Sequence, residues 1–275
     1  MELLEMLKVI LLGIIQSITE WLPISSTGHM LLFDGLVPLQ VSAEFKEVFL
    51  VLIQLGSIMA VVVLYFKKLN PFSRLHTPTE RNRIYNIWFK VIIGSIPAGV
   101  VGVLFDDVID SLFYNSVVVI AIALITYGVA FIVIEHFNKK KTAKVNDIAD
   151  MSYFDAFKIG CFQMLALVPG TSRSGSTIIG AMLIGVNRFT AAEFSFFLAV
   201  PAMAGASLIK MLKFGWNFSS NELVILVMGM IVAFVGSIIV IRFLLDYVKR
   251  HDFKLFGYYR IILGLIVIAY FFLLR

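Results

Sequence analysis

The chain has 275 residues, of which 60% are hydrophobic and 15% are charged, and its mean hydropathy is +0.93. Soluble domains contain about 45–50% apolar and about 25% charged residues, so this composition excludes an ordinary water-soluble domain. The net charge of +5 lies mainly in short segments between apolar runs. That pattern orients helices in a membrane, and we expect no nucleic-acid partner.

Six apolar stretches are long enough to cross a hydrocarbon core of about 30 Å. They lie near residues 44–66, 88–105, 114–135, 189–212, 222–244 and 255–274. Lysine and arginine gather in segments 67–90, 139–144 and 242–254, whereas 106–113 carries aspartate and no base. The positive-inside rule therefore predicts that the three basic segments are cytoplasmic and that 106–113 is external.

Two further apolar regions, 3–36 and 153–186, are interrupted. The first contains a helix that ends near residues 21–23 and then a piece too short to span, and the second breaks at Pro169 and Gly170. We expect each region to be a re-entrant helix pair, the first entering from outside and the second from the cytoplasm. The prediction is an all-α polytopic integral membrane protein with about six transmembrane helices and two re-entrant helix pairs.

The two broken regions resemble each other in sequence. At an offset of 147, the matched pairs are Gly13 and Gly160, Gln16 and Gln163, Ser25 and Ser172, and Gly28 and Gly175. We interpret residues 1–275 as a single membrane domain of two repeats, about 1–135 and 153–275, joined by a basic cytoplasmic loop, 136–152. Three crossings separate the starts of the repeats, so the second is inverted, which places a shared site near the midplane. Chance similarity between apolar segments is the alternative.

Polar side chains concentrate at the two breaks, where membrane burial is costly without a role. Gln16 and Glu20 are four residues apart and share one helix face, and the sequence Ser-Ser-Thr-Gly-His follows at 25–29. The second break is followed by Arg173 among hydroxyl residues. Both breaks expose helix N-termini, which favour anions, and the guanidinium fork of Arg173 suits phosphate oxygens.

These residue types favour phosphoryl transfer from a lipid. Glu20 could orient water, activate a hydroxyl or hold a divalent cation. Ser26 or Thr27 could be a nucleophile, and His29 an acid or base. Three structural alternatives stay open: an ion pair between Glu20 and Arg173, a hydrogen-bonded structural His29, and helix capping by Ser25, Thr171 or Ser176.

At residues 16–29, QSITEWLPISSTGH resembles the acidic motif and the following serine-serine-threonine-glycine-histidine of the bacterial undecaprenyl-diphosphate phosphatase, or bacitracin-resistance, family. The segment PGTSRSGST at 169–177 is similar to that family's second motif, and the motif order, separation and chain length agree. The resemblance implies hydrolysis of a C55 polyprenyl diphosphate to the monophosphate and phosphate. This reaction recycles the carrier lipid for peptidoglycan and other envelope polymers and contributes to bacitracin resistance.

The resemblance implies catalytic roles for Glu20, Ser26, His29 and Arg173. It places the substrate among Gln16, Ser25, Thr27, Gly170, Thr171, Ser172, Ser174 and Thr177. It also implies a divalent cation, Mg²⁺ or Ca²⁺, held by Glu20. Position 16 is glutamine here, where some members have glutamate, and this departure puts a two-carboxylate metal site in doubt. The nucleophile stays open between Ser26, which we favour, His29 and water.

The family resemblance and the charge pattern together predict a location. We expect a multi-pass protein of the bacterial cytoplasmic membrane, with its active site facing the external side, and with polyprenyl diphosphate and membrane lipids as partners. The alternative function is a lipid-phosphate transporter or flippase with a midplane anion site, because broken helices and inverted repeats also build transporters. The oligomeric state stays open, a homodimer being one alternative.

Overall fold

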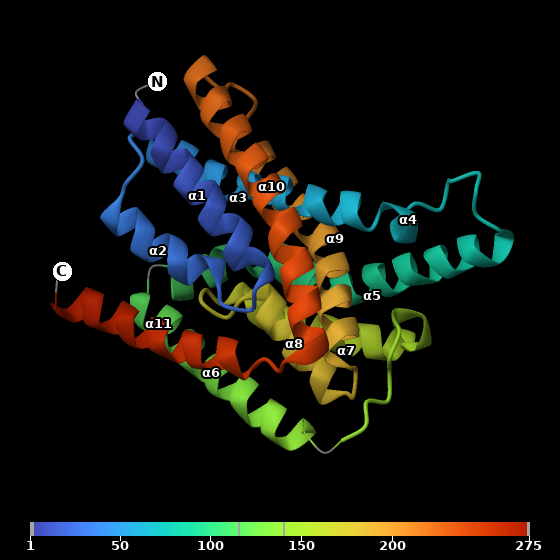
Figure 1. Ribbon diagram of the computed structural model, residues 1–275. Helices are drawn as coiled ribbons and strands as arrows, with labels where there is room; N and C mark the ends of the chain where they lie inside the picture. The colour runs from blue at the N-terminus through green and yellow to red at the C-terminus, as the bar shows by residue number, and fades with distance from the viewer. Residues whose placement is uncertain (1–2, 115, 140, 274–275) are drawn as a thin grey trace.

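The computed structural model describes residues 3–114, 116–139 and 141–273 (Figure 1). Lys140, one of the expected cytoplasmic bases, lies outside the described residues. Within the described ranges the secondary structure is helical, with three short π or 3₁₀ turns at Asp110–Tyr114, Ile148–Asp150 and Leu165–Leu167. The α-helices are α1 (Leu3–Trp21), α2 (Ser26–Leu36), α3 (Ala43–Leu64), α4 (Phe66–Leu69), α5 (Pro78–Ile109), α6 (Val117–Asn138), α7 (Tyr153–Met164), α8 (Arg173–Leu183), α9 (Arg188–Phe214), α10 (Ser220–Arg250) and α11 (Lys254–Leu273).

Six of the described helices, α3, α5, α6, α9, α10 and α11, are long and apolar enough to cross a membrane. This result confirms six helices of spanning length and the all-α class. The largest differences in boundary are at α5, which begins at Pro78 rather than near residue 88, and at α10, which continues to Arg250. Both extensions carry charged residues, so hydropathy alone stops short of the helix ends.

The two broken regions form the helix pairs α1 with α2 and α7 with α8. The second helix of each pair has 11 residues, about 16 Å at 1.5 Å per residue, which is too short to cross a core of about 30 Å. Two short second helices, each following a break, are therefore confirmed. The re-entrant course of the pairs through a bilayer stays a prediction.

The two halves of the chain interlock. Helix α1 packs along α10, and its counterpart α7 packs along α5, while α3 packs against α9 and α6 against α11 (Figure 1). Helices α6 and α11 cross at two glycines in a reciprocal contact: a Cβ on Gly128 or Gly257 would lie 2.7 Å from the carbonyl oxygen of the other residue. Exchanging the halves leaves these pairings unchanged, as a two-fold internal repeat would. The exact repeat boundaries stay a prediction.

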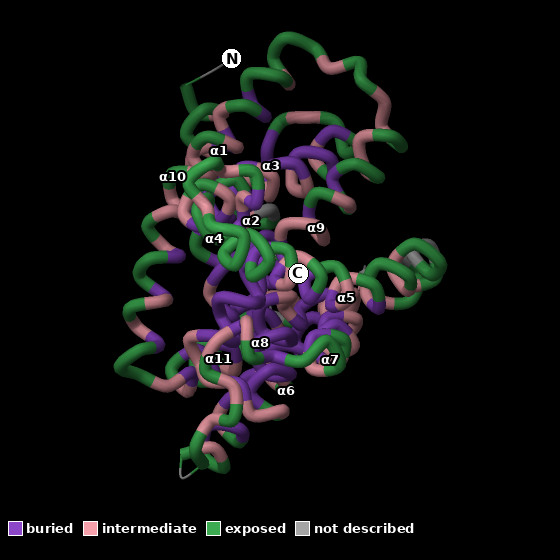
Figure 2. The backbone as a smooth tube through the Cα atoms, turned by 90° about the vertical axis from the view of Figure 1, so that its right-hand side faces the viewer, coloured by how far each residue is buried: buried purple, intermediate pink, exposed green. Residues whose placement is uncertain are grey.

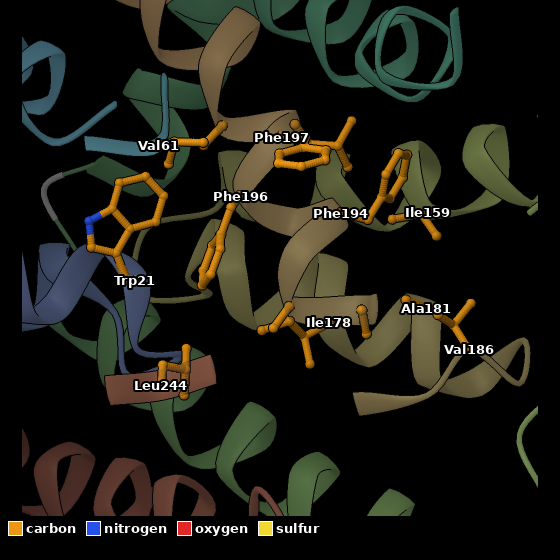
Figure 3. Packing of buried hydrophobic residues seen from close by; sticks show 14 of the residues in the cluster. Trp21, Val61, Ile159, Ile178, Ala181, Val186, Phe194, Phe196, Phe197 and Leu244 are labelled. Atoms are coloured by element: carbon orange, nitrogen blue, oxygen red, sulfur yellow. The ribbon is translucent and has the colours of Figure 1, made fainter. Parts of the chain in front are cut away.

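The core surrounds the second break. Buried residues gather around α8 in Figure 2, and nine of its residues, 174–182, are buried. In Figure 3 the ring of Trp21 from α1 faces Phe196 from α9, with their centroids 5.2 Å apart in an edge-to-face arrangement. Ile178 of α8 and Leu244 of α10 belong to the same cluster. Many large apolar side chains on the outer faces of the long helices are exposed, as a lipid-facing surface requires.

Candidate active site

Each pair turns into its second helix through a serine with an unusual backbone. Ser25 and Ser172 both have a φ of 72°. Their side chains accept hydrogen bonds from the backbone amides of Gly28 at 3.4 Å and Gly175 at 3.2 Å, respectively. A positive φ is uncommon outside glycine and costs energy that the surrounding structure must supply, a feature concentrated at functional sites. The matching φ and capping bond at an offset of 147 are consistent with the predicted internal repeat.

Glu20, at the end of α1, is the centre of a buried polar cluster. Its Oε1 lies 3.3 Å from Nη2 of Arg173, and its Oε2 accepts a hydrogen bond from Nε2 of Gln16 at 3.0 Å. The hydroxyl of Ser26 lies 3.5 Å from the same Oε2. The fold thus brings four predicted site residues from both pairs together across about 150 positions of sequence. The ion pair considered above is present, and it balances a carboxylate that would be costly to bury alone.

Arg173 is held by α9 as well as by Glu20. Its Nη1 donates to the carbonyl oxygen of Ser195 at 2.7 Å, and the Ser195 hydroxyl accepts from Thr177 at 2.7 Å. The guanidinium carbon lies 5.9 Å from the ring centroid of Trp21. Its buried Nε has no hydrogen-bond partner among the described residues. This N–H is therefore an unused hydrogen-bond donor inside the site.

His29 faces away from this cluster. Its Nδ1 lies 2.7 Å from the carbonyl oxygen of Ser25, and its Nε2 lies 2.7 Å from the hydroxyl of Tyr259 on α11. The two ring nitrogens therefore contact Ser25 and Tyr259 rather than Glu20 or Arg173. His29 thus lies one turn beyond Ser26 on α2 but belongs to a hydrogen-bonded pair separate from the cluster around Glu20.

The remaining predicted residues mostly shape the two breaks. Ser174 donates to the backbone carbonyl of Glu20 at 3.2 Å and thereby ties the start of α8 to the end of α1. Gly170 has a φ of 90°, and a Cβ there would lie 2.6 Å from the carbonyl oxygen of Ile120. Thr27, in the first turn of α2, is exposed.

Helix capping explains part of the hydroxyl content. The capping interpretation is confirmed for Ser25, which caps α2. Helix α8 is capped by Ser172 and not by Thr171 or Ser176. The hydroxyl of Ser176 instead donates to the Ser172 carbonyl at 3.0 Å, inside the helix.

Arg260, in the first half of α11, is a site residue that the sequence patterns above did not indicate. It is 0% exposed and donates to the carbonyl oxygens of Pro23 at 3.1 Å, Gly170 at 2.9 Å and Thr171 at 2.9 Å. Two carbonyls of α6 complete its contacts. One guanidinium thus joins both breaks. A lone arginine inside an apolar span was a usable signal, because such residues are rare without a role.

The cluster provides one carboxylate for a cation. No group of three or more His, Cys, Asp or Glu side chains that could hold a metal ion occurs in the described part of the chain. Glu20 and the amide of Gln16 are the oxygen-bearing side chains available at the end of α1. This donor set fits Mg²⁺ or Ca²⁺ if phosphate oxygens and water complete the coordination.

The fold and the cluster define a polytopic α-helical membrane protein with a charged centre where two broken helix pairs meet. The chain belongs to the bacitracin resistance protein BacA family, whose family model matches residues 9–266.

The curated relatives agree with this assignment. The chain is 56% identical over 272 residues to an undecaprenyl-diphosphatase of Desulfitobacterium hafniense, with 98% of each chain covered. It is 57% identical over 273 residues to undecaprenyl-diphosphatase 1 of Clostridioides difficile, with 99% of this chain and 98% of the relative covered. It is 56% identical over 270 residues to an undecaprenyl-diphosphatase of Enterococcus faecalis, with 98% of each covered.

Proposed function

We propose that this protein hydrolyses undecaprenyl diphosphate to undecaprenyl phosphate and inorganic phosphate, and so recycles the carrier lipid for cell-envelope synthesis and contributes to bacitracin resistance. Family membership and relatives of that name over nearly the whole chain support the proposal. The structural observation that carries it is the meeting of Glu20, Ser26 and Arg173 in one buried cluster. A carboxylate, a hydroxyl and a phosphate-binding fork together exceed what anion binding alone requires, so a transporter is not favoured.

In this proposal Arg173 binds the diphosphate. Its planar fork matches phosphate oxygens, and the amides at the starts of α2 and α8 add donors for the anion. The incoming phosphate takes the unused Nε–H of Arg173 and competes with Glu20 for the Nη2 group. Binding therefore loosens the resting ion pair and frees the carboxylate beside Ser26.

Ser26 is the nucleophile that we favour, because its hydroxyl lies within reach of the Glu20 carboxylate. The Ser26 oxygen forms a bond to the terminal phosphorus as the bond from that phosphorus to the bridging oxygen breaks. The serine proton goes to Glu20, and undecaprenyl phosphate leaves. Water then attacks the phosphoserine, inorganic phosphate leaves, and Ser26 regains its proton from Glu20.

We also propose that a divalent cation, Mg²⁺ or Ca²⁺, takes part when substrate is bound. Glu20 would hold it together with the diphosphate oxygens, because no second carboxylate lies at the motif. A cation there would neutralise part of the diphosphate charge. Glutamine at position 16 keeps the protein's own contribution to a single carboxylate.

The membrane location follows from the charge pattern of the chain. We propose the bacterial cytoplasmic membrane, with the active site open to the external side. This orientation rests on the basic segments that flank the spans and on the positive-inside rule. Polyprenyl diphosphate is then the substrate, and membrane lipids surround the protein.

The test is inorganic phosphate release from C55 polyprenyl diphosphate by purified protein in detergent, with and without a chelator. We expect cation-dependent release by the wild type and its loss in Glu20→Gln and Ser26→Ala. Glu47→Gln and Ser220→Ala are matched controls, because both positions are exposed. Absence of release from folded wild-type protein with ample divalent cation would overturn the phosphatase proposal in favour of transport.

A further inference from the structure

The contacts of His29 define its tautomer when the ring is neutral. The side chain is buried at 7% exposure, and Nδ1 lies 2.7 Å from a backbone carbonyl oxygen, that of Ser25. A carbonyl only accepts hydrogen bonds, so Nδ1 carries the proton of the neutral ring and Nε2 carries the lone pair. The Tyr259 hydroxyl, 2.7 Å from Nε2, is then the donor. The two rings are stacked, with an interplanar angle of 6° and centroids 5.6 Å apart.

Tyr259 completes the contacts of this buried imidazole. Both nitrogens of His29 are occupied, one by a main-chain carbonyl and the other by the tyrosine hydroxyl. Tyr259 itself is 43% exposed and lies on α11, a helix long and apolar enough to cross a membrane. The Tyr259 hydroxyl therefore holds the imidazole in one orientation.

The position of Tyr259 is coupled to the catalytic cluster. The next residue, Arg260, is fully buried and donates to carbonyls at both breaks. Helix α11 therefore holds the Tyr259 hydroxyl in a fixed relation to α2, which carries His29 and Ser26. A tyrosine that only packed against lipid would need neither this anchor nor the hydrogen bond.

We propose that Tyr259 is a positioning residue of the reaction, which fixes the tautomer and orientation of His29; this inference rests on the proposed phosphatase function. The resemblance of residues 16–29 to the family motif implies a catalytic role for His29, and His29 shares α2 with Ser26. Without the Tyr259 hydroxyl, Nε2 loses its donor and the ring is held only by the bond of Nδ1 to the Ser25 carbonyl.

The test uses the full-length protein in detergent. Tyr259→Phe removes one oxygen and keeps the stacked ring, and we expect kcat to fall about 10- to 100-fold, with KM changed by less than about 3-fold, because the tautomer and orientation of His29 are affected rather than substrate binding. In a His29→Gln background the same substitution should change kcat by less than about 2-fold, because the two residues act as one unit. Tyr258→Phe, an exposed neighbour on α11, is the matched control and should keep wild-type kcat.

A second measurement is independent of activity. Nitrogen NMR of histidine-labelled protein should show one ring protonated at Nδ1, identified as His29 by its loss in His29→Gln, and its Nε2 signal should shift in Tyr259→Phe. Wild-type kcat in Tyr259→Phe, additive losses in the double variant, or an unshifted Nε2 signal would overturn the role of Tyr259. Failure of the wild type to release phosphate would instead overturn the proposed function, so the two failures are distinguishable.

Discussion

The two broken helix pairs share a backbone but differ in chemistry. Both second helices begin at a serine with a φ of 72° and the same capping bond. At the matched positions the side chains diverge: Ser26 corresponds to Arg173, and Glu20 corresponds to Leu167. If the predicted repeat holds, two similar scaffolds carry different groups, with the carboxylate and hydroxyl of Glu20 and Ser26 on one and the guanidinium of Arg173 on the other. Two helix pairs that face each other can therefore bring the opposite charges of Glu20 and Arg173 together.

The pairs also differ in how tightly they are packed. Nearly all of α8 is buried in the central core, whereas α2 borders a cavity of about 260 Å³ that is shared with α6 and α11. The second pair is therefore the fixed partner of the site. The first pair, which carries the acid, the hydroxyl and the histidine, has more room to adjust.

The largest effect is expected from breaking the charge match between the pairs. Arg173→Ala should lower phosphate release about 1,000-fold or more, because a preorganised donor for the phosphate is lost, and should destabilise the fold by about 3–5 kcal/mol, because Glu20 is left buried and unpaired. Arg173→Lys should stay poor, since a point charge replaces a fork. Activity assays and thermal unfolding in detergent measure both effects.

A double variant separates the two roles of Arg173. Glu20→Gln combined with Arg173→Ala removes both charges and should regain much of the lost stability without regaining activity. Near-normal turnover in Arg173→Lys, or a double variant as unstable as Arg173→Ala, would contradict the assignment of the ion pair.

The next effect concerns the residue that joins the two breaks. Arg260→Met should lower the unfolding free energy by about 3 kcal/mol or more, because several buried carbonyls lose their donor and each such loss costs about 1–3 kcal/mol. Activity should fall with it, since both breaks lose their common anchor. Arg242→Met on α10 is an exposed arginine for comparison and should leave the melting temperature nearly unchanged. Equal melting temperatures for the two variants would refute the anchoring role.

A pair of glycines tests the difference in packing. A Cβ at Gly180 of α8 would lie 2.5 Å from the ring of Phe162, close to its backbone, whereas at Gly35 of α2 the nearest atom is the hydroxyl of Tyr270 at 2.7 Å, the end of a long side chain. Gly180→Ala should therefore cost about 1–3 kcal/mol from overpacking. Gly35→Ala should be within about 1 kcal/mol of wild type, because alanine also favours the helix. Equal stability losses in thermal unfolding would show that the two pairs are equally rigid.

The sequence alone predicts those features of the fold that depend only on neighbouring residues. Hydropathy identifies six crossings because each span needs only its own composition, and Pro169 with Gly170 marks a break because these residues restrict or free the backbone. The meeting of Glu20 with Arg173 was predictable from the two motifs together. The pairing of His29 with Tyr259 was not, because it depends on the register of α11 against α2, some 230 residues away. The contacts of Ser195 with Arg173 and Thr177 could not be predicted either, because they depend on the packing of α9 beside α8.

The smallest expected effects concern two glutamines at matched positions, Gln16 on α1 and Gln163 on α7. Gln16 donates to Glu20, but Gln163, equally buried, has no hydrogen-bond partner for either amide atom within the described ranges. Divergence explains the difference, because the position that matches Glu20 is Leu167. Gln163→Leu should leave activity unchanged and stabilise the fold by about 1 kcal/mol, since an unpaired buried amide is replaced by an apolar group of similar size.

Gln16→Leu should act in the opposite sense. It removes a donor from the buried Glu20 carboxylate, so turnover should fall about 10-fold, the effect expected for a lost hydrogen bond to a charged group of about 1.5 kcal/mol. Phosphate release and thermal unfolding of the two variants, measured side by side, check the difference. If Gln16→Leu and Gln163→Leu had the same effect on turnover and stability, the hydrogen bond from Gln16 to Glu20 would not contribute to activity. That result would contradict the role of Gln16 as a donor to the Glu20 carboxylate.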